Sequence, residues 1–120
     1  MLIIDDEPGV RRSLEMIAST DGWETWSCDQ FADILLIIRE KEIEVVVCDY
    51  RMPPITGIHI IRQIRDAGLR LPVVMITANP DNVDSRIVRE LEVREILRKP
   101  PNVKDVRTVL ADAAAQVKRG

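Results

Sequence analysis

Short apolar runs alternate along the whole chain with segments whose apolar residues recur at helical spacing, and this alternation limits the fold more than any other feature. The apolar runs predict strands at residues 2–4, 23–28, 45–48, 72–76 and 95–98. The helical spacing predicts helices at residues 10–18, 31–38, 60–67, 82–91 and 103–117. Strands that alternate with helices join through right-handed crossovers into a parallel sheet covered on both faces. The sequence therefore predicts an α/β fold of five strands and five helices.

Size and charge are typical of one soluble domain, which we expect to span residues 1–120. The formal net charge of −3 opposes a nucleic-acid-binding face, which would be basic. The apolar runs are far shorter than the ~20 residues of a membrane-spanning helix, and residues 1–4 lack the pattern of a signal peptide. Cys28 and Cys48 lie in apolar runs and are expected to be buried and reduced. We therefore expect a cytoplasmic protein without direct contact to nucleic acid or membrane.

Polar residues follow the predicted strands at the points where ligands bind in open parallel sheets. Asp5 and Asp6 end the first strand, Asp49 the third, Thr77 the fourth and Lys99 the fifth. Converging carboxylates favour a hard cation, Mg²⁺ or Mn²⁺. A hydroxyl and an ammonium would add contacts for a dianionic phosphoryl group. The residues thus indicate phosphoryl handling, with a carboxylate as a possible nucleophile, and do not identify which carboxylate is attacked.

Four segments resemble the receiver domain of bacterial two-component response regulators. They are residues 2–8, residues 49–53 with Gly57, residues 73–78, and Lys99-Pro100, and they follow one another across nearly the whole chain. The resemblance implies a flavodoxin-like, doubly wound (βα)5 fold with strand order 2-1-3-4-5. It also implies two-component phosphorelay signalling, and not turnover of an external substrate.

The resemblance implies that Asp49 is the phospho-acceptor and that Mg²⁺ binds beside it. A sensor histidine kinase or a histidine phosphotransfer protein would donate the phosphoryl group. Asp6 would ligate the metal directly, and Asp5 would hold a metal-bound water. Asp49 itself and the backbone carbonyl of Arg51 would complete the protein ligands.

The resemblance also implies how the signal would leave the site. Lys99 would pair with a phosphoryl oxygen, and Thr77 would turn its hydroxyl toward another. The switch position three residues before Lys99 is usually Tyr or Phe in this family and is Ile96 here. The Lys99–Pro100 peptide bond would be cis. The helix at 82–91, the strand at 95–98 and the last helix would contact an output domain, a partner or a second copy, and the arginines expected on that first helix are Arg86, Arg89 and Arg94.

Two alternatives stay open. A binding module could keep this fold and switch without phosphorylation, which Ile96 favours and the complete set of charged residues opposes. An enzyme is the other: a phosphatase with an aspartate nucleophile would carry Asp-x-Asp after the first strand, and a flavin carrier a loop rich in Ser, Thr and Gly. Residues 5–7 are Asp-Asp-Glu instead, which alone would also suit a solvated helix start.

His59 has no evident partner, and Trp23 and Trp26 are expected to pack at the core or the sheet edge.

Overall fold

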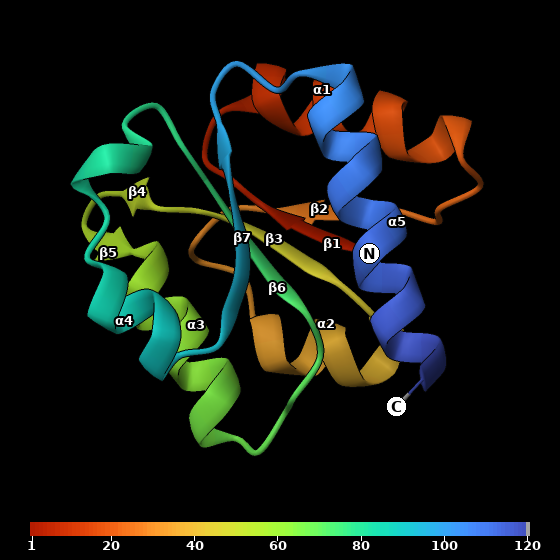
Figure 1. Ribbon diagram of the computed structural model, residues 1–120. Coiled ribbons are helices and arrows are strands. Elements are labelled where there is room, and N and C mark those ends of the chain that lie inside the picture. The colour runs from red at the N-terminus through yellow and green to blue at the C-terminus, as the bar shows by residue number, and fades with distance from the viewer. Residues whose placement is uncertain (120) are drawn as a thin grey trace.

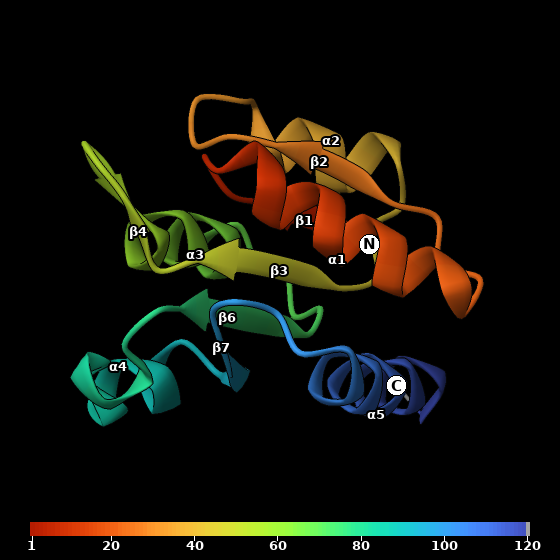
Figure 2. The same cartoon turned by 90° about the horizontal axis from the view of Figure 1, so that it is seen from above.

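Five parallel strands form one sheet, and the computed structural model describes residues 1–119, with side chains for residues 1–117. The strands are β1 (Leu2–Ile4), β2 (Trp26–Cys28), β3 (Val46–Asp49), β6 (Val73–Thr77) and β7 (Val93–Arg98). They lie side by side in the order β2-β1-β3-β6-β7 (Figure 2). Counted along the chain this order is 2-1-3-4-5, so the predicted flavodoxin-like topology is confirmed. Gly120, the last residue of the predicted domain, lies outside the described residues.

Helices cover both faces of this sheet. They are α1 (Pro8–Thr20), α2 (Ile34–Glu40), α3 (Gly57–Asp66), α4 (Ser85–Glu90) and α5 (Val103–Arg119). In Figure 1, α1 and α5 lie beside each other on one side of the sheet, and α2, α3 and α4 lie on the other. None of the helices in residues 1–119 is both long enough and apolar enough to cross a membrane.

The strands separate two apolar clusters because successive side chains of a strand point to opposite faces. Leu2 and Ile4 pack toward α2 and α3, whereas Ile3 between them packs toward α1 and α5. All three side chains are fully buried. Burial on both faces explains why the central strands read as continuous apolar runs.

Arg65 is an unusual member of this interior. Its side chain extends from the last turn of α3 and is 9% exposed. The guanidinium donates hydrogen bonds to the carbonyls of Leu69 and Leu71, which follow α3, at 3.0 and 2.8 Å. It also donates to the carbonyls of Leu91 and Glu92, which follow α4, at 2.8 and 3.1 Å. One buried cation therefore ties the end of α4 to the segment that follows α3.

Two helices begin later than their apolar spacing predicts. Asp33 precedes α2, and its carboxylate accepts a hydrogen bond from the Leu36 N–H, so the helix begins at Ile34. Phe31, which we predicted on this helix, lies before it and is 67% exposed. Asp84 caps α4 in the same way, and a short 3₁₀ turn at Pro80–Asn82 replaces the predicted start of that helix. The predictions for Phe31 and for residues 82–84 were therefore wrong.

Strand boundaries also differ from the predictions. β2 begins at Trp26, not at residue 23, and β7 begins at Val93, whose side chain is buried. Arg94 therefore lies on β7 and not on the fourth helix. A small antiparallel hairpin, β4 (Arg51–Met52) paired with β5 (Ile55–Thr56), lies between β3 and α3, where we predicted no strand. The Lys99–Pro100 peptide bond is cis as expected, and so is Pro53–Pro54.

Candidate functional site

Four carboxylates gather where β1 and β3 end. Asp5, Asp6, Glu7 and Asp49 each offer an oxygen within 4.8 Å of the others. Asp5 and Asp49 are buried, at 0% and 2% exposure, whereas Asp6 and Glu7 are exposed. β1 pairs directly with β3, so the two strands deliver their last residues to the same edge.

The local backbone holds the two buried carboxylates in place. The Glu7 N–H donates a hydrogen bond to Asp5 Oδ1 at 2.9 Å, and α1 begins at Pro8 directly afterwards. The Arg51 N–H donates to Asp49 Oδ1 at 3.2 Å. In both cases a carboxylate accepts from the backbone two residues ahead, as is usual for aspartate in a tight turn. One oxygen of each carboxylate is thus fixed, and the other faces the cluster.

Lys99 places an ammonium against this cluster. Its Nζ lies 2.8 Å from Glu7 Oε1, 3.0 Å from Asp49 Oδ2 and 3.1 Å from Asp5 Oδ2. The Lys99 N–H also donates to the Thr77 carbonyl at 2.9 Å, which holds the residue beside the end of β6. Burial lowers the pKa of Lys99, but its hydrogen bonds to these carboxylates outweigh that effect and raise the pKa above its ordinary value. The ammonium therefore stays charged.

The environment of Asp5 favours the binding of a cation. Burial raises its pKa from 3.8 to about 6, and the negative charge of Asp49 adds to the shift, while the Glu7 N–H and Lys99 oppose it. Asp5 Oδ2 is buried, and its one partner among the described residues is the Lys99 ammonium at 3.1 Å. Four carboxylates that share a single ammonium leave an excess of negative charge, which fits Mg²⁺ or Mn²⁺, because these ions prefer oxygen ligands.

Thr77 and Ile96 lie close to this edge but outside the acidic cluster. Thr77 ends β6, one residue beyond Ile76, which pairs with Asp49, and its side chain is almost fully buried. The Thr77 hydroxyl accepts a hydrogen bond from the Asn79 N–H at 3.2 Å. Ile96 is half-buried and packs against the cluster formed with α2, α3 and α4.

Our sequence prediction of the site left out Glu7, which contacts Lys99. It stands in the acidic run 5–7, which was the available signal. Arg86 and Arg89, which we expected on the fourth helix, are exposed on α4. Arg94 pairs across to Asp112 of α5 at 3.0 Å. His59 is exposed, with Gln63 beside it.

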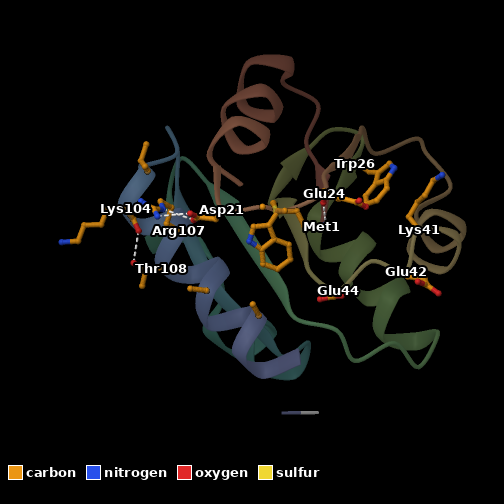
Figure 3. A pocket seen from close by; sticks show the side chains of 15 residues that line it. Met1, Asp21, Glu24, Trp26, Lys41, Glu42, Glu44, Lys104, Arg107 and Thr108 are labelled. Carbon is orange, nitrogen blue, oxygen red and sulfur yellow. Dashed lines mark hydrogen bonds and ion pairs between the residues drawn. The ribbon is translucent and has the colours of Figure 1, made fainter. Parts of the chain in front are cut away.

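A groove of about 1280 Å³ lies at the opposite edge of the sheet, at the amino ends of β1, β2 and β3 (Figure 3). Trp23 and Trp26 both line it, and each packs against one of the two apolar clusters, as expected for tryptophans at a sheet edge. The Lys41 ammonium lies 6.0 Å from the Trp26 ring. Arg107 of α5 pairs with Asp21 at 2.9 Å on the rim.

Both cysteines are free thiols, but only one is fully buried. Cys48 is 0% exposed, whereas Cys28 is half-buried, which corrects the prediction for that residue. Burial raises the pKa of the Cys28 thiol to about 11, and the pKa of Cys48 is raised as well for the same reason. Both thiols therefore stay protonated near neutral pH.

Comparisons with known proteins agree on one family. The profile of the response regulator receiver domain matches residues 1–111. The sensor histidine kinase RcsC of Salmonella typhi is 29% identical over 119 residues, which are 99% of this chain and 13% of that protein. The DNA-binding response regulator MtrA of Mycolicibacterium smegmatis is 29% identical over 107 residues, 88% of this chain and 46% of that protein. A solved response regulator receiver domain protein from Clostridium thermocellum has a TM-score of 0.85 at 27% identity, over 98% of this chain and 94% of that one. The chain thus spans less than half the length of the two curated relatives.

Proposed function

This chain belongs to the response regulator receiver domain family, and from that premise we propose that it accepts a phosphoryl group on Asp49 with Mg²⁺ bound beside it. Receiver domains are signalling domains of two-component systems, consistent with phosphorelay signalling. The observation that carries the proposal is the meeting of Asp5, Asp49 and Lys99 at one sheet edge, with contacts of 3.0 and 3.1 Å to the ammonium.

Asp49 is the acceptor in this proposal because its carboxylate lies between a backbone N–H and the Lys99 ammonium. Its Oδ1 is held by the Arg51 N–H, and its Oδ2 faces Lys99. A carboxylate oxygen would attack the phosphorus of a phosphohistidine. The new O–P bond forms as the P–N bond breaks, and the electron pair returns to the imidazole nitrogen. The side chain is 3% exposed, so the donor must approach from the open side of the cluster.

Asp5, Asp6, Asp49 and the backbone carbonyl of Arg51 would hold the metal ion. Mg²⁺ bound there would supply positive charge to neutralise the phosphoryl oxygens. The Lys99 ammonium would form an ion pair with one phosphoryl oxygen, and the Thr77 hydroxyl would donate a hydrogen bond to another. Mn²⁺ would substitute, because the donors are all oxygen.

The partners follow from the same proposal. The phosphoryl donor would be a sensor histidine kinase or a histidine phosphotransfer protein. Phosphorylation would change the conformation of the face formed by α4, β7 and α5. This face would contact an output domain, a partner or a second copy. Support comes from the relatives, since one is a sensor histidine kinase and another a DNA-binding response regulator. We expect this to occur in the cytoplasm, without direct binding of nucleic acid or membrane by this domain.

Mass spectrometry after incubation with Mg²⁺ and acetyl phosphate tests the proposal. We expect the wild type to gain one phosphoryl group, mapped to Asp49, and Asp49→Asn to remain folded and unlabelled. Asp29→Asn is the matched control, because Asp29 follows β2 at the same edge but contacts neither Lys99 nor Asp49 among the described residues. It should label like the wild type. Labelling at another residue in Asp49→Asn would refute the acceptor.

Two other functions give different results in the same assays. A binding module that switches without phosphorylation, which Ile96 would favour, would show no mass gain at all. A phosphatase would release phosphate repeatedly from phosphate esters, and a flavin carrier would purify with yellow colour. We expect neither turnover nor colour.

A further inference from the structure

Three carboxylates that differ in exposure surround the Lys99 ammonium. The contact to Glu7, at 2.8 Å, is the shortest of the three. Yet the Glu7 side chain is 60% exposed, whereas those of Asp5 and Asp49 are 0% and 3% exposed. An ammonium has three N–H donors and no more, so three carboxylates take up its capacity.

A phosphoryl group on Asp49 would therefore compete for Lys99. It brings about two negative charges and three strong acceptor oxygens. Asp5 cannot leave, because it is buried and its Oδ1 accepts from the Glu7 N–H. Asp49 carries the group itself. The Glu7 carboxylate is the one that can turn to water at little cost, as exposed ion pairs are weak.

Among the described residues, the Glu7 side chain makes no hydrogen bond or ion pair except that with Lys99. It precedes α1 as the N-cap residue, but its side chain accepts no hydrogen bond from that helix. That partner, Lys99, lies 92 residues away in the sequence. Replacing the carboxylate by an amide of the same shape therefore leaves the helix start as it is.

We propose that Glu7 holds Lys99 in the unphosphorylated chain and is displaced from it by the phosphoryl group, so that Glu7 is a positioning residue that opposes the phosphorylated state. This inference rests on the proposed function of Asp49 and Lys99. It assigns the third acid of the run 5–7 a role distinct from metal binding.

Binding of beryllofluoride, a tetrahedral mimic of a phosphoryl group, tests the inference at equilibrium. Titration calorimetry in the presence of Mg²⁺ should show that Glu7→Gln binds beryllofluoride about two- to fivefold more tightly than the wild type, the size expected for losing an exposed ion pair. Asp29→Asn should bind as the wild type does, since it removes one negative charge from the same edge without touching Lys99. Unchanged or weaker binding by Glu7→Gln would overturn the inference.

A double-mutant cycle with Lys99→Met separates an action through Lys99 from an action on the metal. Methionine keeps an unbranched side chain without the charge. In the Lys99→Met background, adding Glu7→Gln should leave beryllofluoride binding unchanged. A gain that persists there would mean that Glu7 acts through general charge. A loss of Mg²⁺ affinity in Glu7→Gln as large as that in Asp6→Asn would mean that Glu7 is a metal ligand. Either result contradicts the inference.

Different results would contradict the proposed function and the role of Glu7. A wild type that neither labels with acetyl phosphate nor binds beryllofluoride contradicts the proposed function. A wild type that does both, with Glu7→Gln indistinguishable from it, contradicts the role of Glu7 alone.

Discussion

Gly57 lies so close to the carbonyl group of Asp49 that no side chain fits between them. A Cβ built on Gly57 would be 2.0 Å from the Asp49 carbonyl oxygen and 2.9 Å from its carbonyl carbon. The Gly57 N–H also donates to the Tyr50 carbonyl at 3.0 Å, and α3 begins at this residue. The start of α3 is therefore packed directly on the backbone of the candidate phospho-acceptor.

Gly57→Ala should destabilise the fold, because backbone on both sides must shift to admit the methyl group. We expect a loss of about 1–3 kcal/mol in the free energy of unfolding, measured with urea. Gly9→Ala is the control, because a Cβ at that position in α1 would have no atom within 4 Å apart from its chain neighbours and the backbone of its own helix. The control should be neutral or slightly more stable. A Gly57→Ala variant as stable as the wild type would contradict this close packing.

Asp5 should make the metal-free protein less stable as the pH rises. Its pKa is about 6 in the folded chain, against an ordinary value of 3.8, so the folded state binds more protons between these values. Stability contributed by this group is complete below about pH 4, falls through about pH 6 and is then constant. Asp5→Asn should therefore be more stable than the wild type by about 1–3 kcal/mol at pH 7.5, with little difference at pH 4.

Urea unfolding at both pH values, with and without Mg²⁺, checks this expectation. Mg²⁺ should raise the stability of the wild type at pH 7.5 and do so much less in Asp5→Asn, because the buried carboxylate is missing. Finding Asp5→Asn less stable at pH 7.5 without metal would show that its ion pair with Lys99 outweighs the cost of burial.

Ile96→Tyr should change communication with a partner and leave the chemistry alone. Ile96 pairs in register with Met75 and packs against the apolar cluster under α2, α3 and α4, whereas the carboxylates gather where β1 and β3 end. We expect the initial rate of labelling by acetyl phosphate to match the wild type. The amide chemical shifts of α4 and β7 in the labelled variant should differ from those in the labelled wild type. A large change in labelling rate would mean that the switch lies elsewhere.

Arg65→Met should destabilise the fold without affecting labelling per molecule of folded protein. The substitution leaves four carbonyls without their donor, and one unsatisfied buried group alone costs about 1–3 kcal/mol. Arg62→Met, one turn earlier on α3, is the control, because Arg62 makes a single exposed ion pair with Glu90 at 2.9 Å. Urea unfolding should show a much larger loss for Arg65→Met. Similar losses for the two variants would contradict the structural role of Arg65.

The sequence predicted the elements that apolar patterns determine directly. The run 45–48 predicted a strand buried on both faces. The charged residues that end the first, third and fifth strands predicted which side chains meet there, namely Asp5, Asp6, Asp49 and Lys99. Element boundaries were less predictable, because the caps at Asp33 and Asp84 compete with apolar spacing. Arg94 was misplaced because burial of Val93 extends β7 by two residues.

Contacts between distant residues could not be predicted in the same way. The Glu7–Lys99 contact joins residues 92 positions apart and depends on the rotamers of two long side chains. The four carbonyls around Arg65 become available only when α3 and α4 end side by side. Neither arrangement leaves a local pattern in the sequence.

The groove with Trp23 and Trp26 lies at the amino ends of the strands, and the acidic cluster lies at the carboxyl ends. Both tryptophans of the chain therefore stand at the edge remote from the candidate metal site. Intrinsic fluorescence would be a poor reporter of metal binding in this protein. A tryptophan introduced at the exposed position Arg51, beside the carboxylates, would convert the emission into a local optical probe of the site.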